Sequence, residues 1–391
     1  MPSTIKIPFG PQHPALKEPE SFLFEVDGEY VVDVVPRIGY AHRGIEKALE
    51  SRTYIQNLYL IERICGICSH AHTTCYTQAV EEALKVDVPS RARYIRTIVA
   101  ELERIHNHYL WLGLLAHEIG FDTLFMYTWR DREIVMDLLE RISGNRVQYA
   151  MNIIGGVRRD ITPEVSSEIT KGIEVLSERM KYYKKVCSDE KTMLARTTNV
   201  GVLKAKDAVS LCAVGPTLRA SSVKRDVRAD DPYAAYDEIP FQVVTNDGCD
   251  LASRVATRCD EVVESVGIIQ YALDHMPKGS IEVIVSRVIP SDEVVSRVEA
   301  PRGENLHYLR SNETDKPARY KIRAPTLANL SALCKMLIGG YIADIPAVIA
   351  GIDPCFCCMD RLTFIDVNSD KTWNWKCDEL RRHAIKWHKE Q

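Results

Sequence analysis

The sequence predicts an α+β fold that is mainly a helical bundle, with small β-sheets near both termini. Long stretches in the middle of the chain carry apolar residues at helical spacing, whereas short runs rich in β-branched and aromatic residues occur near the start and again after residue 280. No Pro-, Gly- or Ser-rich linker divides the chain convincingly. We therefore expect one domain over residues 1–361, followed by a C-terminal extension over residues 362–391.

The first forty residues predict strands. Residues 22–26 and 30–34 are rich in aromatic and β-branched side chains, and Gly28 lies in the turn signal between them. The Pro-rich stretch before them, 10–19, predicts an irregular loop that contains Glu18. Without further context, Glu18 is most simply a solvated loop carboxylate.

Helices are predicted through the middle of the chain. Pro89 and Ser90 begin the longest one, in which apolar residues recur at near-3.6 spacing up to its predicted end at Gly120. Such stripes are typical of the core faces of a bundle, so we expect His106 and His108 to be structural. The predicted helices cover residues 45–67, 71–84, 90–120, 130–146, 163–193, 249–276 and 326–337.

Residues 197–250 predict a less regular insertion, whose mixed charges, among them Arg219, are typical of a solvated or subunit-facing surface. After the helix that follows this insertion, strands are predicted at residues 281–285, 308–310 and 318–323.

Composition excludes several classes of protein. The formal net charge is −4, which gives no electrostatic reason to expect that the protein binds nucleic acid. No run reaches the roughly 18 apolar residues of a membrane-spanning helix, so membrane association is expected to come through partner subunits. No secretory signal opens the chain, and its 12 cysteines therefore favour a reducing compartment where thiolates serve metals.

Two Cys-x-x-Cys pairs lie near opposite ends of the predicted domain. Cys65 and Cys68 form the first pair, and Cys355 and Cys358 form the second. Two intervening residues let both sulfurs turn toward one point, so the two pairs together predict a four-thiolate site for a soft metal. Structural zinc, an iron–sulfur cluster and unpaired core cysteines all remain open at this point.

Polar residues around the pairs favour a reactive site over a structural one. Zinc ribbons usually bring their pairs within a few tens of residues of each other, unlike the pairs here. We name residues 62–72 the N-terminal motif and residues 353–361 the C-terminal motif. They carry polar groups that a structural site does not need: Glu62, Arg63, His72, Asp353 and Arg361.

The two motifs resemble the nickel-binding signatures of the large subunit of NiFe-hydrogenases. The first follows Arg-x-Cys-Gly-x-Cys-x-x-x-His and the second Asp-Pro-Cys-x-x-Cys-x-x-Arg. Arg361, where many members have His, resembles the membrane-bound, energy-converting group, which is related to respiratory complex I. Further matches in family order extend the resemblance over nearly all of the chain up to Arg361: residues 10–14, 39–44, 215–220 and 300–303.

The resemblance implies a NiFe-hydrogenase large-subunit fold and reversible heterolytic cleavage of H2. Nickel would be held by all four cysteines, with Cys65 and Cys355 terminal and Cys68 and Cys358 bridging to an iron that carries carbonyl and cyanide. Cys355 would take up the proton, and Glu18 would carry it onward.

Three further residues receive roles from the resemblance. His72 would hydrogen-bond a bridging cysteine sulfur. Arg302, by default a surface arginine in a turn, would lie over the open metal position. Asp353 would brace Arg302 or a backbone amide. Cys357 is unusual within the C-terminal motif and leaves ligand swapping as an alternative, although the spacing of Cys355 and Cys358 fits the family better.

The resemblance also implies partners. The other eight cysteines lack cluster spacing, so we expect no iron–sulfur cluster in this chain and a small partner subunit with a 4Fe–4S cluster instead. Ferredoxin or a similar donor would exchange electrons through other subunits. Antiporter-like membrane subunits would couple the reaction to ion translocation and hold the chain at the cytoplasmic face of the membrane.

Three alternatives remain. One is a complex I-like subunit that shapes a quinone pocket, which His42 and Arg43 would suit. The second is a sulfur-reducing relative, and the third is a zinc-stabilised scaffold without catalysis. The four cysteines count against the first and the intact C-terminal motif against the second, while metal analysis would separate the third.

The chain continues for 30 residues past Arg361. In most of the family, maturation ends with a protease that cuts at this position, whereas some energy-converting members end there naturally. A basic, helix-like tail at residues 378–389 would keep the C-terminal motif open until nickel arrives. The alternative is an ordinary last helix that docks on a partner.

Overall fold

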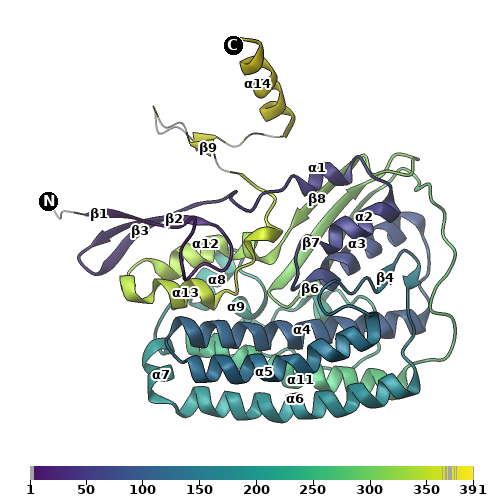
Figure 1. The fold of residues 1–391 in the computed structure, drawn as a ribbon, viewed down its shortest axis with the longest axis horizontal. Coiled ribbons are helices and arrows are strands. Elements are labelled where there is room, and N and C mark those ends of the chain that lie inside the picture. The colour runs from purple at the N-terminus through teal and green to yellow at the C-terminus, as the bar shows by residue number, and fades with distance from the viewer. Residues whose placement is uncertain are drawn as a thin grey trace.

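The computed structural model describes residues 4–362, 364–365, 368, 372–373, 375 and 377–390. Long helices run side by side along one side of the molecule (Figure 1). α4 packs against α5 and α11, and α6 packs against the same two helices, which closes the bundle. None of the helices within the described residues is long and apolar enough to cross a membrane. The bundle helices are α4 (Ser90–Glu118), α5 (Asp122–Ser143), α6 (Pro163–Asp189) and α11 (Leu251–His275).

α4 is the central helix, and it is buried on nearly all sides. The predicted core residues from Ile95 to Leu112 are buried, and His106 and His108 are buried with them. The helix ends close to the predicted stop at Gly120, which has a positive φ of 85°. Glycine adopts this conformation after a helix without the steric cost that other residues have.

An N-terminal sheet packs against the last part of the domain. Its strands β1 (Ile5–Phe9), β2 (Ser21–Asp27) and β3 (Tyr30–Arg37) are antiparallel in the order β1-β2-β3. Their inward side chains share a core with α12 (Pro325–Leu337) and α13 (Ile345–Gly351), so the two ends of the domain lie side by side.

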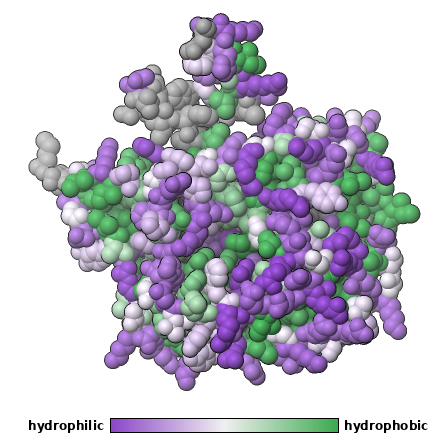
Figure 2. Space-filling model, viewed as in Figure 1, coloured by the Kyte–Doolittle hydropathy of each residue, from purple (hydrophilic) through white to green (hydrophobic). Residues whose placement is uncertain are grey.

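The outer face of β3 is apolar and exposed. Tyr30, Val32 and Val35 alternate with buried residues on this strand, and each has more than two fifths of its surface accessible. Hydrophobic residues accordingly reach the surface over the N-terminal sheet (Figure 2).

A second sheet covers α3 (Ser69–Leu84), the helix that follows the first cysteine pair. Its strands are β6 (Glu293–Ala300), β7 (Gly303–Arg310) and β8 (Arg319–Arg323), again antiparallel in sequence order. Gly303, at the tight turn from β6 to β7, has a φ of 129° and touches the backbone of Gly215, so a side chain has no room there. This turn carries Arg302 toward the cysteines.

The helical bundle with small antiparallel sheets confirms the predicted fold class, but several boundaries differ. The predicted helix 45–67 is divided into α1 (Ile45–Leu49) and α2 (Tyr54–Glu62), because Thr53 and Gln56 form a capping box that starts a new helix. Predicted helix 163–193 breaks at Glu190, where α7 (Lys191–Thr197) begins.

The predicted strand 281–285 and the interpretation of the insertion 197–250 need to be compared separately with the structure. The predicted strand 281–285 is an extended segment that makes only a bridge from Glu282 to Gly156, beside the short hairpin of β4 (Asn152–Ile153) and β5 (Gly156–Val157). The insertion 197–250 is irregular, as predicted. The helices of the insertion are short: α8 (Ala205–Ser210), α9 (Gly215–Arg219) and α10 (Val227–Asp230). After residue 361 the described elements are strands β9 (Phe364–Ile365) and β10 (Thr372–Trp373) and helix α14 (Cys377–Lys389).

The interpretation of the insertion's charges as a solvated surface is wrong for its central arginine. Arg219 is fully buried and contacts Glu261 at 2.8 Å and Glu299 at 2.6 Å. Burial opposes ionisation of Glu261, yet the charge of Arg219 lowers its pKa well below the usual range. The insertion therefore contributes a buried ion network that ties α9 to α11 and β6.

Replacing Arg219 by Met should destabilise the protein strongly, because it leaves Glu261 and Glu299 buried without their cation. We expect a loss of about 3–5 kcal/mol in the free energy of unfolding measured with urea. Arg141→Met is the matched control, since it breaks an exposed pair with Glu168 and should lower the free energy of unfolding far less. Equal losses for the two variants would contradict the importance of the buried network.

Candidate metal centre

The two cysteine pairs meet at one point between α3 and the end of the domain. The four Sγ atoms all lie within 4.8 Å of one another, and all four residues are buried. Individual distances are 3.3 Å from Cys65 to Cys355, 3.7 Å from Cys68 to Cys358 and 2.9 Å from Cys355 to Cys358. A metal–sulfur bond of about 2.3 Å separates the sulfurs of a tetrahedral site by roughly 3.8 Å, so a small adjustment lets them bind one ion.

The electrostatics of the thiols also fit a cation. Hydrogen bonds from Cys355 lower the pKa of Cys65, and one from Cys357 lowers that of Cys355. Their partners move the other way, because the Cys355 thiolate raises the pKa of both Cys68 and Cys358. Four buried thiols therefore do not ionise together unless a positive ion joins them. Soft divalent metals suit such a donor set.

The first pair is held by a carboxylate from the bundle. Glu103 on α4 accepts hydrogen bonds from the backbone N–H groups of His70 at 2.7 Å and Ala71 at 3.0 Å. These N–H groups lie at the start of α3, where they have no partner within the helix and Cys68 offers no side-chain cap. Burial raises the pKa of Glu103 to about 8. Sequence reasoning missed this residue, which is one of several charged residues on α4, beside Glu101 and Arg104.

His72 lies beside the second cysteine pair, with Nε2 at 3.4 Å from the Cys358 sulfur. Its Nδ1 is 3.1 Å from Nε2 of His307, whose Nδ1 is 2.7 Å from the Tyr320 hydroxyl. Burial lowers the pKa of His72 to about 4, so the ring is neutral. With Cys358 as a thiolate, one proton order satisfies the row: Tyr320 donates to His307, His307 donates to His72, and His72 donates to Cys358.

His307 and Asn305 were missed by the sequence reasoning. Both lie on β7, and the Asn305 amide nitrogen is 3.3 Å from His72 and 3.2 Å from His307. The available signal was their alternation: with Leu309 they occupy every second, buried position of the strand.

Arg302 is buried beside the cysteines, so its default interpretation as a surface arginine is wrong. Its Nη2 contacts the Asp353 carboxylate at 3.0 Å, and its Nε donates to the Asp353 carbonyl at 2.8 Å. Asn107 on α4 donates to the same carboxylate at 2.7 Å. The Nη1 atom of Arg302 is buried and has no partner, which leaves one donor free for a group bound at the centre.

Glu18 extends from the loop between β1 and β2 to the C-terminal motif. One carboxylate oxygen accepts from the Cys357 N–H at 2.8 Å, and the other is 3.9 Å from the Cys355 sulfur. Glu18 also lines a surface depression of about 420 Å³ with Gln12 and His13. The carboxylate therefore joins the second cysteine pair to the protein surface.

Arg43 links the two motifs directly. Its guanidinium donates to the carbonyl of Arg63 at 3.0 Å, of Ile64 at 2.6 Å and of Cys357 at 2.9 Å. In sequence this arginine was only a positive turn or a quinone-site candidate. A planar, five-donor side chain is well suited to join three carbonyls from two segments.

The remaining charged residues of the motifs have structural partners. Arg63 is largely exposed and donates to Tyr59, while Glu62 accepts from the backbone of Ala150. Arg361 donates to Glu46 at 2.8 Å.

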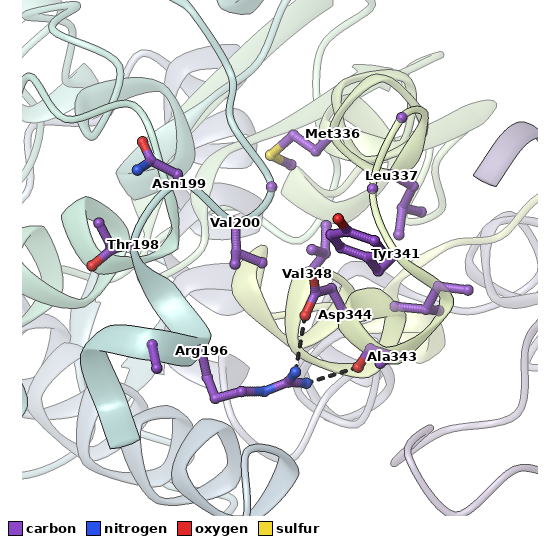
Figure 3. Close-up of a pocket in the computed structure, with 15 residues that line it drawn as sticks. Arg196, Thr198, Asn199, Val200, Met336, Leu337, Tyr341, Ala343, Asp344 and Val348 are labelled. Carbon is purple, nitrogen blue, oxygen red and sulfur yellow. Dashed lines mark hydrogen bonds and ion pairs between the residues drawn. The ribbon is translucent and has the colours of Figure 1, made fainter. Parts of the chain in front are cut away.

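A separate pocket of about 410 Å³ lies between α7 and the α12–α13 segment (Figure 3). Arg196 crosses it to Asp344 and the Ala343 carbonyl at 3.1 and 2.8 Å, so its ion pair is already satisfied. None of the four cysteines is among its lining residues. The reactive groups are gathered at the cysteines instead.

Known proteins resemble the chain over nearly its whole length. A family model of the respiratory-chain NADH dehydrogenase 49 kDa subunit matches residues 118–289 and 283–361, and one of nickel-dependent hydrogenases matches residues 43–123. The membrane-bound hydrogenase subunit alpha of Pyrococcus furiosus is 42% identical over 377 residues, which cover 92% of this chain and 88% of that protein. An NADH-quinone oxidoreductase subunit of Rhizobium etli (strain CIAT 652) is 37% identical over 385 residues, covering 91% and 95%.

A solved structure confirms the fold. A chain of the membrane-bound sulfane sulfur reductase, an archaeal respiratory membrane complex, superposes on this chain with a TM-score of 0.87 at 33% sequence identity. The match covers 92% of this chain and 98% of the reductase chain. These relatives are subunits of redox complexes, and two of them are described as membrane-bound. The chain belongs to the family that unites the large subunits of nickel-dependent, membrane-bound hydrogenases with the 49 kDa subunit of respiratory-chain NADH dehydrogenase.

Proposed function

We propose that the chain is the catalytic subunit of a NiFe-hydrogenase complex that splits H2 heterolytically or forms it from protons. The observation that carries this proposal is the convergence of four buried thiols with an unpartnered arginine N–H beside them. A nickel–iron centre held by Cys65, Cys68, Cys355 and Cys358, with carbonyl and cyanide on the iron, would supply the redox chemistry.

The chain's own residues would move the proton. Cys355 takes it on Sγ and passes it to Glu18, whose nearer oxygen is 3.9 Å away. The Cys357 N–H holds the other oxygen of Glu18, so the carboxylate stays oriented toward the sulfur. From Glu18 the proton leaves through the depression beside Gln12 and His13, or enters by the same route when H2 is formed.

Two other residues would shape the electrostatics of the centre. The free Nη1 of Arg302 is a fixed positive donor that orients a small molecule at the open metal position, while Asp353 and Asn107 keep the guanidinium in place. His72 donates to the Cys358 sulfur and so tunes its electron density.

Electrons would leave through a small partner subunit with a 4Fe–4S cluster and reach ferredoxin or a similar carrier. Antiporter-like membrane subunits would hold the chain at the cytoplasmic face of the membrane. The exposed apolar face of β3, Tyr30, Val32 and Val35, supports a subunit that is covered in a larger assembly.

A second candidate function is quinone or sulfane sulfur reduction. It is favoured by the match to the 49 kDa subunit model and by the TM-score of 0.87 with the sulfur reductase. The four converging thiols favour H2 chemistry, because a quinone pocket does not need them. Parallel assays with H2, quinone and polysulfide on the purified complex separate the candidates.

We also propose that residues 362–391 are removed during maturation. The backbone at Arg361 and Leu362 packs against Gly39, where a side chain would collide with Leu362. Glu46 holds the Arg361 side chain. These contacts fix the chain at the proposed cleavage position.

The mature protein should contain about one nickel per chain. Cys358→Ala should abolish hydrogenase activity and nickel binding by the four-cysteine set, because it opens that ligand set, whereas Cys212→Ser, at an exposed position, should change neither. Elemental analysis of the anaerobically purified complex measures this. Zinc at full occupancy without nickel in active material would contradict the proposed function.

Glu18→Gln should lower proton–deuterium exchange with H2 by roughly a hundredfold or more in fully loaded enzyme, because Gln accepts the Cys357 hydrogen bond but does not ionise. Metal content at full loading should stay unchanged. Glu25→Gln, on the exposed part of β2 near Thr4, is the control and should leave exchange intact. Normal exchange in the Glu18 variant would remove this residue from the proton route.

Intact-mass measurement of the active complex should give a chain that ends at Arg361, with the full-length chain persisting in cells starved of nickel. The three tryptophans of the extension, Trp373, Trp375 and Trp387, give an independent optical count. Fully active enzyme that retains the mass of residues 362–391 would refute removal and favour the docking alternative.

A further inference from the structure

We propose a second metal-binding set at the entrance of the centre, formed by Glu18, Cys355 and Cys357. One carboxylate oxygen and two Sγ atoms from these residues all lie within 4.8 Å of one another. The two sulfurs are 3.3 Å apart, and Glu18 is 3.9 Å from the Cys355 sulfur. Cys355 belongs to both sets, so the outer set and the four-cysteine set share one ligand.

Metal-independent contacts hold the outer set in place. The short helix η2 (Phe356–Cys358) brings Cys357 back beside Cys355. The Cys355 N–H donates to Thr326 at 2.9 Å, and the Cys357 N–H donates to Glu18 at 2.8 Å. Arg43 holds the Cys357 carbonyl at 2.9 Å. These bonds use backbone groups and leave both thiols free to bind an ion.

The donor set selects a class of ligand. Two thiols and one carboxylate match the sulfur and oxygen preferences of borderline-soft divalent ions such as Ni²⁺, Co²⁺ and Zn²⁺. Bonds of about 2.3 Å at a right angle would separate two sulfurs by roughly 3.3 Å, the observed distance from Cys355 to Cys357. Only three side chains contribute, so water completes the coordination and exchanges readily.

Burial gives the two sets an order. Glu18 and Cys357 are half-buried, and Glu18 lines the surface depression with His13, whereas the four cysteines of the inner set are buried. An ion that arrives from solvent therefore meets Glu18 and Cys357 before it reaches Cys65 and Cys68. The inner set offers four thiolates instead of two, which is the better site for a soft ion.

We infer that nickel binds first at the outer set and then moves inward by ligand exchange, with Cys355 bound throughout. The choice of nickel rests on the proposed function. Cys65, Cys68 and Cys358 release three thiol protons as they bind. Cys357 takes one proton back, the other two leave to water through the depression beside Glu18, and Glu18 is freed for its proton-carrying role. No electron is transferred. This assigns a function to Cys357, which the proposed catalytic steps do not use as a thiol.

The outer set is isolated by replacing Cys65, Cys68 and Cys358 with Ser in the full-length chain from nickel-depleted cells. NiCl2 is the probe, and equilibrium dialysis with thiolate–nickel charge-transfer absorption is the readout under anaerobic conditions. We expect about one Ni²⁺ per chain. Adding Cys357→Ser should weaken binding about tenfold or more, whereas adding Cys212→Ser should not. Binding that does not depend on Cys357 would overturn the proposal.

A single Cys357→Ser variant provides a second test that does not rely on the triple substitution being folded. Its inner set is intact, so the final nickel content after full loading should equal that of the native chain. The rate of nickel uptake should fall about tenfold or more. An unchanged uptake rate would overturn the proposal. Nickel uptake that depends on Cys357 in a chain without H2 activity would count against the proposed function alone.

Discussion

The centre is organised by the cost of placing four thiols together in a buried site. Thiolates repel one another there, and thiols alone gain little from such close approach, so the arrangement is stable only with a cation or with a rigid frame around it. The described residues supply that frame. Glu103 holds the start of α3, Arg43 joins three carbonyls of the two motifs, and the N-terminal sheet packs on α12 and α13.

The frame continues into a layer of polar side chains that are themselves fixed. The row from Tyr320 through His307 to His72 has one satisfactory proton order when Cys358 is a thiolate. Asn107 and Asp353 hold Arg302 so that one N–H stays free. Hydrogen bonds of this kind restrict the movement of the polar side chains around the four thiols, which would help the proposed chemistry. Rigidity therefore serves the chemistry as much as stability.

Sequence patterns predicted the bundle and the motifs because both depend on short-range spacing: 3.6 residues for α4 and two intervening residues for each cysteine pair. Patterns failed where distant segments decide the outcome. Arg219 lies in a charged stretch of sequence and is buried only because Glu261 and Glu299, from distant segments, pair with it. Arg43 became significant once two motifs far apart in sequence were adjacent, and residues 281–285 meet only the two-residue strand β5. The roles of Glu18 and Arg302 came from family resemblance, not from spacing.

The distance between the two cysteine pairs along the chain also has a consequence for synthesis. Cys65 and Cys355 are 290 residues apart, so at a translation rate of about 5–20 residues per second the first pair leaves the ribosome roughly 15–60 s before its partner exists. During that interval it is an exposed dithiol that binds stray zinc or copper readily. If nickel enters only through the ligands of the C-terminal motif, which is synthesised last, metal loading would indicate that the whole chain has been translated and folded.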